Sequence, residues 1–158
     1  MLNINIICVG KVKEKYLKDA ILEYSKRLSK YCKLNITEIA DEPIPSNLSD
    51  KLAENIKDVE GNKILNSIKN SFIISLDLNG KEYSSEKFAE KINNISLNSS
   101  NITFIIGGSL GLSKEVINNS NELICFSKMT FPHQLIRVFL LEQIFRAFKI
   151  NNNETYHR

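Results

Sequence analysis

The sequence predicts an α/β fold with a mostly parallel sheet and helices on both faces. Short apolar runs rich in β-branched residues alternate with longer stretches of helical periodicity along the whole chain. The first run, residues 3–9, has the composition of a buried strand and stops at Gly10. A length of 158 residues with 42% hydrophobic and 25% charged residues suits one compact domain over residues 1–158.

Five strands and five helices are expected in alternating order. The strands are predicted at residues 3–9, 34–40, 71–78, 102–106 and 122–126. The helices are predicted at residues 16–31, from the loop 41–46 to about residue 70, at residues 84–95, after Ser113, and at residues 133–149. Ser84 and Ser113 are expected N-caps. Gly61 could interrupt the second helix, and Asn79-Gly80 predicts a turn.

The final predicted helix has almost no continuous polar face. A helix that is apolar nearly all round is covered on several sides, so we expect it to pack on the sheet and on a second subunit. At 100° per residue, His133 and Arg137 share one side, and Glu142 and Arg146 share the opposite side. We expect Glu142 and Arg146 to form an ion pair, either as a structural contact at a dimer interface or as part of a substrate site.

The net charge of +3 is distributed unevenly. Residues 1–33 carry eight basic and three acidic side chains, residues 34–127 carry eight and thirteen, and residues 128–158 carry five and two. If the two basic ends meet in the fold or across a dimer, they would form one positive surface suited to nucleic acid. Ordinary solvated helix faces are the alternative explanation for residues 11–33.

Several function classes are disfavoured by what the sequence lacks. Cys8, Cys32 and Cys125 are widely spaced and the chain has two histidines, so neither a disulfide framework nor a metal site is expected. There is no signal-like start and no apolar run of about 18 residues, which predicts a soluble, cytoplasmic protein without a membrane segment. No P-loop, nucleophile elbow or adjacent Cys–His pair is present, so covalent hydrolase chemistry is not expected.

A glycine-rich loop, Gly107-Gly108-Ser-Leu-Gly111, follows the fourth predicted strand and precedes a helix. It lacks the dinucleotide fingerprint because Ile106 stands at the position of the first glycine. One explanation for the glycines is ligand binding, because the absence of side chains would let a flat or bulky ligand reach the main chain. The alternative explanation is tight packing between the strand and the helix. Group transfer from a bound cofactor fits these features, because it requires only a pocket, a positioned acceptor and a group that handles a proton.

The basic C-terminal end carries residue types that suit RNA. Tyr156 could stack on a base, Arg158 could contact a phosphate, and His157 could handle a proton. A frayed chain end is the alternative explanation.

Six segments of the sequence resemble the RlmH family of SPOUT methyltransferases, which act on large-subunit ribosomal RNA. The segments are residues 9–16, 23–28, 105–112, 129–133, 141–148 and 156–158. They run in order from end to end, and the last three are the most specific. The resemblance implies that residues 102–150, approximately, form a deep trefoil knot, an exception to the usual absence of knots. It also implies an obligate homodimer. Phe145 stands where a tyrosine is common, which puts a hydroxyl role there in doubt.

The resemblance further implies an activity and a set of site residues. The activity is S-adenosylmethionine-dependent methylation of N3 of a pseudouridine in helix 69 of 23S rRNA, in the assembled ribosome. The implied cofactor pocket contains Leu76, Gly107, Gly108, Ser127, Lys128, Met129, Thr130, Phe131 and Pro132. The implied catalytic or substrate positions are His133, Arg146, Tyr156, His157 and Arg158. Two alternatives stay open: a non-catalytic ribosome-binding or RNA-binding module, and the same fold methylating a ribose 2′-hydroxyl.

Overall fold

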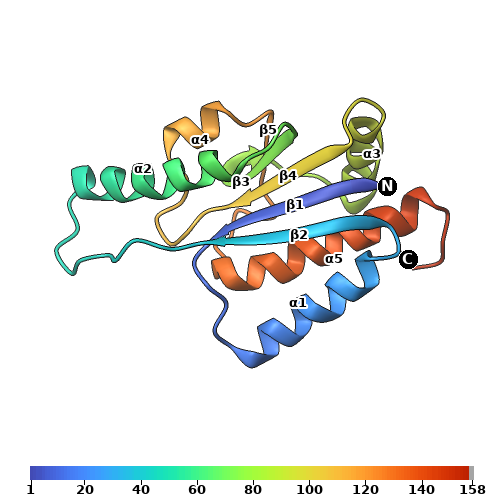
Figure 1. Ribbon diagram of the computed structural model, residues 1–158, viewed down its shortest axis with the longest axis horizontal. Helices are drawn as coiled ribbons and strands as arrows, with labels where there is room; N and C mark the ends of the chain where they lie inside the picture. Colours follow the sequence, from blue (N-terminus) through green and yellow to red (C-terminus); the bar gives the residue numbers. More distant parts are fainter. Residues whose placement is uncertain (157–158) are drawn as a thin grey trace.

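The computed structural model describes residues 1–156, and in this part of the chain five parallel strands form one sheet (Figure 1). The strands are β1 (Leu2–Val9), β2 (Cys32–Ile39), β3 (Phe72–Lys81), β4 (Asn101–Ile106) and β5 (Glu122–Ile124). Their order in the sheet is β2-β1-β4-β3-β5, and every pairing is parallel. The predicted parallel α/β fold is therefore confirmed. All five strands end at one edge of the sheet, which we call the carboxyl edge.

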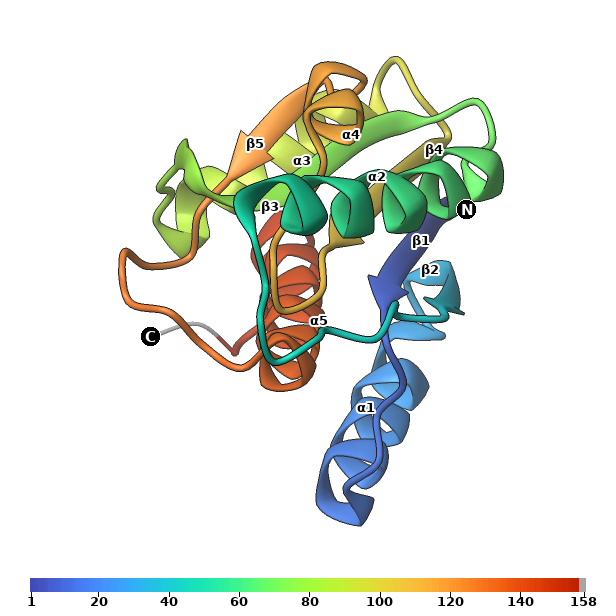
Figure 2. The same ribbon diagram turned by 90° about the vertical axis from the view of Figure 1, so that its left-hand side faces the viewer.

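Helices cover both faces of the sheet, as predicted. The helices are α1 (Lys15–Leu28), α2 (Asp50–Ser67), α3 (Ser85–Ser96), α4 (Lys114–Asn118) and α5 (His133–Asn151). On one face α5 packs between α1 and α3, and on the other face α2 packs beside α4 (Figures 1 and 2). No helix within residues 1–156 combines the length and the apolar character that a membrane crossing requires.

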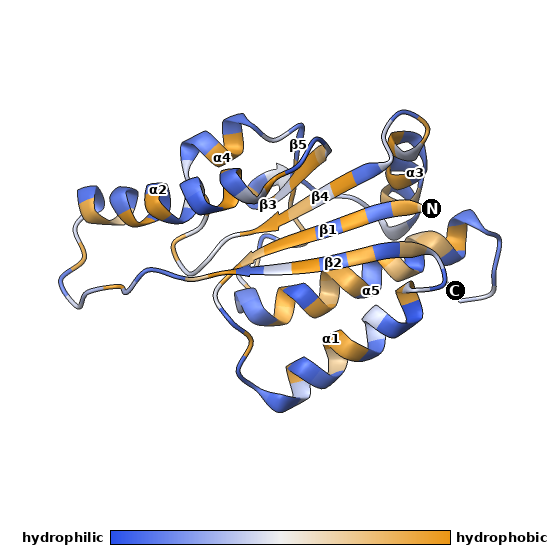
Figure 3. Ribbon diagram, viewed as in Figure 1, coloured by the Kyte–Doolittle hydropathy of each residue, from blue (hydrophilic) through white to orange (hydrophobic). Residues whose placement is uncertain are grey.

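The core is divided by the sheet into two apolar layers. Along β1, Ile4, Ile6 and Cys8 contribute to the layer under α1, α3 and α5, whereas Ile7 and Val9 contribute to the layer under α2 and α4. This alternation follows from the two-residue period of a strand. Burial on both faces explains why the central strands are apolar along most of their length, as Figure 3 shows.

Local capping signals place the starts of two helices. The Ser84 side chain accepts a hydrogen bond from the Lys87 N–H at 3.1 Å, and the Ser113 side chain accepts one from the Val116 N–H at 3.2 Å. Each bond satisfies a backbone donor that the first helical turn leaves unpaired. The two predicted N-caps are confirmed.

Two glycine predictions are wrong, and close packing explains both. Helix α2 runs unbroken through Gly61, where an added Cβ would lie 2.4 Å from the Ser113 side-chain oxygen. The Asn79-Gly80 pair lies inside β3 at an irregularity in its pairing with β5, and not in a turn that leaves the sheet. A Cβ at Gly80 would lie 2.6 Å from the Ile124 carbonyl carbon. Both glycines allow one backbone to approach another element closely.

The order of elements accommodates the knot predicted for residues 102–150. After β4 the chain passes through the glycine loop and α4, enters β5 at the outer edge of the sheet, and returns to the opposite face as α5. The threading itself stays a prediction.

A buried arginine joins α5 to the ends of β1 and β2. Arg137 is 2% exposed, and its Nη1 donates to Glu38 Oε2 at 2.8 Å. Its Nη2 donates to the carbonyls of Val9 at 3.2 Å and Gly10 at 2.8 Å. The same Glu38 oxygen accepts the Val12 N–H at 2.9 Å. We call these contacts the Arg137 latch. They hold the first turn of α5 and the segment after β1 in one position.

Replacing Arg137 with methionine should lower the free energy of unfolding by about 2 to 4 kcal/mol, because two buried carbonyls and a partly buried carboxylate lose their donor. Urea denaturation measures this change. Lys15→Gln removes a pair between exposed side chains, with Asp19, and should leave the transition unchanged. Equal transitions for the wild type and Arg137→Met would contradict a structural role for the latch.

Candidate functional site

A cleft of about 380 Å³ opens at the carboxyl edge of the sheet, where β3, β4 and β5 end. Its volume lies in the range of about 300 to 1,000 Å³ that is usual for small-molecule sites. In open α/β sheets ligands bind outside the carboxyl ends of the strands, so the position is the expected one for a functional site.

Most of the residues predicted for the cofactor pocket line this cleft. Leu76 lies within β3, at the first position past the pairing of that strand with β4. Gly107 and Gly108 come from the loop after β4, and the segment after β5 contributes Ser127, Met129, Thr130 and Phe131. Lys128 and Pro132 belong to the same segment but are not among the lining residues. The fold therefore brings together residues that lie up to 55 positions apart in the chain, from Leu76 to Phe131.

The glycine loop both packs tightly against its neighbours and exposes main chain to the cleft, the two explanations that its sequence allowed. A Cβ at Gly107 would lie 3.0 Å from both Gly111 and Leu112, and one at Gly108 would lie 3.1 Å from Val9 Cγ1. Close packing therefore favours glycine at these two positions. Gly111 has a φ of +86°, its N–H donates to the Gly108 carbonyl at 3.1 Å, and a Cβ there would meet nothing within 4 Å. The loop is a tight turn that leaves main chain facing the cleft.

A buried carboxyl group, which the sequence analysis missed, lies beneath this loop. Glu60 is 5% exposed, its Oε1 lies 3.5 Å from the Cβ position of Gly108, and its Oε2 accepts the Glu42 N–H at 3.0 Å. Burial raises the pKa of Glu60 above its usual value, although the Glu42 hydrogen bond acts in the opposite direction. The sequence pattern that could have predicted the burial of Glu60 is its spacing from Ile56 and Ile64. The three residues are four positions apart and share the buried side of α2.

His133 forms part of the cleft wall at the start of α5. Its Nε2 lies 3.6 Å from the Cβ position of Gly10, and its side chain is half-buried. Burial, and then the charge of Arg137, lower the pKa of His133 below its usual value, whereas Asp41 acts in the opposite direction. The imidazole is consequently neutral near pH 7 and can accept a proton.

The other predicted site residues lie near the far end of α5. The predicted ion pair is confirmed, with Arg146 Nη2 at 2.7 Å from Glu142 Oε1. The Tyr156 hydroxyl donates to the same Glu142 oxygen at 3.1 Å, and the Arg146 guanidinium lies 4.7 Å from the centre of the Tyr156 ring. We call Glu142, Arg146 and Tyr156 the C-terminal cluster. His157 and Arg158 lie outside the described residues.

The helix separates the cleft from the C-terminal cluster. Arg146 lies thirteen positions after His133, which is about 20 Å along an α-helix. A single copy of the chain therefore does not bring Arg146 and Tyr156 to the cleft. The predicted catalytic positions fall into two groups, at the start of α5 and near its end.

A second hollow of about 280 Å³ lies between the cleft and the C-terminal cluster. Phe131 lines both hollows, and Glu142 of the cluster lines the second. The Phe131 and Phe139 rings meet edge to face at 5.6 Å, yet they remain 37% and 39% exposed. An apolar part of the α5 surface is thus left uncovered in a single chain.

The two basic ends of the chain meet on the α5 side of the sheet. Helix α1 packs along α5 (Figure 1). The Arg27 guanidinium lies 5.8 Å from the centre of the Phe145 ring. The basic N-terminal and C-terminal segments therefore lie side by side in the fold, which a shared positive surface requires.

The remaining nucleophiles are poorly suited to covalent chemistry. The three cysteines are buried free thiols, and burial raises the pKa of both Cys8 and Cys32 to about 12. Within residues 1–156 no group of three or more His, Cys, Asp or Glu side chains is placed to hold a metal ion.

Comparisons with known proteins give one consistent family. The model of a family described as predicted SPOUT methyltransferase matches residues 2–157. A Ribosomal RNA large subunit methyltransferase H of Clostridium botulinum (strain Eklund 17B) is 63% identical over 99% of this chain and its own full length. The protein of the same name from Clostridium tetani is 59% identical with the same coverage. Among solved structures, a probable methylase family protein from Haemophilus influenzae has a TM-score of 0.54 at 12% identity, covering 98% of this chain and 70% of its own, which indicates a similar fold.

The pKa of His133 should lie below 6.5 in the folded protein. NMR titration of the imidazole protons measures it, and His133→Gln identifies the resonance because the chain has only two histidines. Since the folded-state pKa is lowered, the unfolded chain binds the proton more readily, and stability should fall as the pH drops below about 6.5. A midpoint at or above 6.5 would contradict the desolvated position of the ring.

Proposed function

Because the chain belongs to the ribosomal RNA large subunit methyltransferase H family of SPOUT methyltransferases, we propose that it methylates large-subunit ribosomal RNA. The proposed acceptor is N3 of a pseudouridine in helix 69 of 23S rRNA, in the assembled ribosome, and the proposed donor is S-adenosylmethionine. The observation that carries the proposal is the cleft, in which β3 and the segments after β4 and β5 bring together most of the residues expected for the cofactor pocket. Residues 1–158 would act as one domain in the cytoplasm, where ribosomes are found.

The residues of the cleft suit an adenosine-containing cofactor. Apolar side chains such as Leu76 and Phe131 can contact the faces of a base, and the main chain of the glycine loop and of residues 127–131 can bind polar edges. S-adenosylmethionine would supply an electrophilic methyl group there. Binding through main-chain groups explains why the sequence needs no nucleotide fingerprint.

We propose that His133 removes the proton from N3 of the acceptor base. Burial and the charge of Arg137 favour the neutral imidazole in the resting protein. Its unprotonated nitrogen at the cleft wall can accept the proton from N3 of the base. His157, the other histidine of the chain, is the alternative base. Arg146, Tyr156 and Arg158 would contact the RNA.

The two groups of site residues support a homodimer as the functional unit. About 20 Å of helix separates His133 from Arg146 in one chain. The exposed Phe139 ring lies on α5 between them and contacts the exposed Phe131 ring of the segment before α5, and both rings are available for a subunit contact. In the proposed dimer, the cleft of one subunit faces the C-terminal cluster of its partner, so that each active site contains residues of both chains.

The two alternatives make different demands on the same cleft. A non-catalytic RNA-binding module has no need of a cofactor cleft with an open glycine loop, so cofactor binding separates it from an enzyme. A 2′-hydroxyl methyltransferase would bind the same cofactor but modify the ribose, so the position of the methyl group separates it from the base-modifying enzyme.

Gly108→Val should reduce the affinity for S-adenosylmethionine more than tenfold, because the new side chain would collide with Val9 and shift the glycine loop. Isothermal titration calorimetry measures the affinity, and sedimentation tests whether the oligomeric state is retained. Gly108→Ala, with a smaller clash, should have a weaker effect. Normal affinity in the valine variant would place the cofactor elsewhere.

Cells that lack this protein should lose one methyl group from the helix 69 pseudouridine, and expression of the wild type should restore it. Mass spectrometry of the isolated RNA fragment measures both the presence and the position of the group. His133→Gln should restore it poorly while still binding the cofactor. Retention of the methylated base in the deletion strain would refute the proposed acceptor.

A further inference from the structure

A lysine-rich segment leaves the sheet directly beside the cleft. Val9 lies against Gly108 of the glycine loop, and Gly10 lies against His133. Lys11 and Lys13 follow at once, before α1 begins at Lys15. The position places basic side chains at the carboxyl edge, next to the proposed site of methyl transfer. Neither Lys11 nor Lys13 has a role in the proposed methyl transfer.

This segment is held in a defined conformation. The Gly10 N–H donates to the Ile39 carbonyl at 2.7 Å, and the Val12 N–H donates to Glu38 of the Arg137 latch at 2.9 Å. The Val12 side chain is buried, whereas Lys11 and Lys13 on either side of it are exposed. The two lysines therefore present their charges to solvent on either side of the buried Val12.

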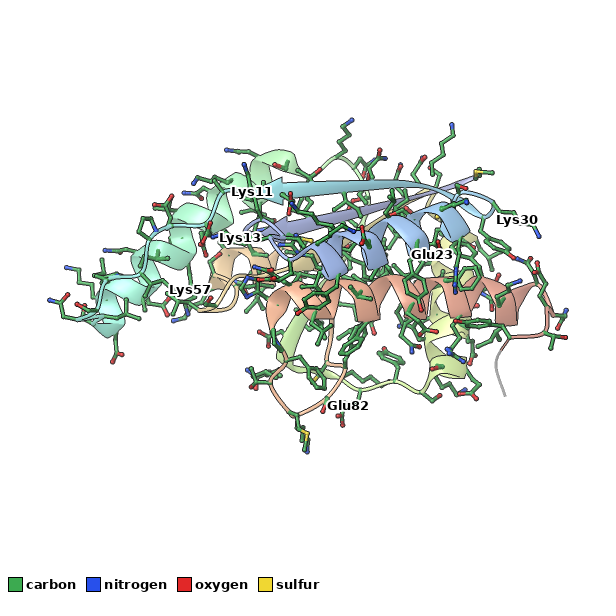
Figure 4. The ribbon with its side chains drawn as sticks, turned by 90° about the horizontal axis from the view of Figure 1, so that it is seen from below. Lys11, Lys13, Glu23, Lys30, Lys57 and Glu82 are labelled. Atoms are coloured by element: carbon green, nitrogen blue, oxygen red, sulfur yellow. The ribbon has the colours of Figure 1, made fainter. Side chains whose placement is uncertain are left out.

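The charges of these two lysines are available to a ligand. Within residues 1–156 neither Lys11 nor Lys13 forms a salt bridge, whereas Lys15 pairs with Asp19 at 2.7 Å and Lys57 with Glu54 at 2.7 Å. The nearby Glu38 carboxylate is bound by Arg137 at 2.8 Å and also interacts with the charge of Lys11, but it forms no salt bridge with that lysine. Figure 4 shows Lys11 and Lys13 at one end of α1 and Lys30 at the other.

An exposed aromatic ring lies in the same region. Tyr16, in the first turn of α1, is 68% exposed. Lysines beside an exposed tyrosine match the way proteins bind single-stranded RNA, with cations on the phosphates and a ring that stacks on an unpaired base.

We propose that Lys11, Lys13 and Tyr16 form an RNA-docking surface on the segment that leads from the carboxyl edge into α1. The two ammonium groups contact phosphates of the RNA substrate, and an unpaired base of that RNA stacks on Tyr16. The inference rests on the proposed function, because it takes the substrate to be RNA. A protein partner fits less well, since Tyr16 is surrounded by charged residues and offers little apolar area.

The test compares Lys11→Gln/Lys13→Gln with the matched control Lys33→Gln/Lys69→Gln. The control removes the same charge from exposed positions at the amino edge of the sheet, in β2 and just before β3. The probe is the ribosome from a strain that lacks this protein. Binding is measured over a series of salt concentrations, together with kcat and KM for methyl transfer and calorimetric affinity for S-adenosylmethionine.

The Lys11→Gln/Lys13→Gln variant should bind ribosomes about tenfold more weakly at low salt. The negative slope of log affinity against log salt should become shallower by about 1.4, the value for two lost phosphate contacts on a single strand. KM should rise while kcat and cofactor affinity stay unchanged. Tyr16→Ala should weaken binding by about fivefold to a hundredfold without changing the slope. The control should match the wild type.

Unchanged affinity and slope in the Lys11→Gln/Lys13→Gln variant would overturn the docking surface, as would an equal effect of the control. A change of sedimentation coefficient in Tyr16→Ala would also overturn it and would assign the ring to a subunit contact. Absence of S-adenosylmethionine binding by the wild type would refute the proposed methyl transfer instead. The cofactor and ribosome measurements thus separate the two proposals.

Discussion

The buried guanidinium of Arg137 is the contact on which the carboxyl edge depends. A buried cation is costly unless it is paired and hydrogen-bonded, and here the two terminal nitrogens reach two carbonyls at the end of β1 and a carboxylate of β2, whereas the buried Nε has no hydrogen-bond partner in the described residues. The observed placement of α5 meets all three acceptors. That placement sets His133 one turn away against Gly10, and it orients the segment that carries Lys11 and Lys13. The cleft wall and the proposed RNA-docking surface therefore share one structural support.

The stiffness of α5 has a second consequence for function. A helix of 19 residues extends about 28 Å, and it holds the cleft and the C-terminal cluster apart. Glu142 binds both Arg146 and Tyr156, so this cluster is itself ordered in a single chain. In our proposal, dimerisation brings the two groups of site residues together. The +3 net charge then matters less than its location, since the basic N-terminal and C-terminal segments lie together on the α1 and α5 side.

Features that depend on neighbours along the chain could be predicted from the sequence. The strands, the helices, the Ser84 and Ser113 caps and the ion pair of Glu142 with Arg146 all follow from spacings of one to four residues. Features that depend on distant partners could not. Gly61 fits closely against Ser113, which lies 52 positions away, and Gly80 fits closely against Ile124, which lies 44 positions away. Local sequence does not show these contacts, so it predicted a possible helix break at Gly61 and a turn at Gly80.

For the site, the sequence by itself determined which segments are rich in glycine, basic side chains or aromatic rings, and that the strands ending in them are parallel. Parallel strands end at a common edge, so these segments had to lie near one another. Only the tertiary structure decided that Val9, Glu60 and Gly108 meet beneath the glycine loop, that His133 rests on Gly10, and that Arg146 and Tyr156 stay away from the cleft. The reason is physical: periodicity is a property of a local segment, whereas these contacts follow from how the buried side chains of different segments pack together.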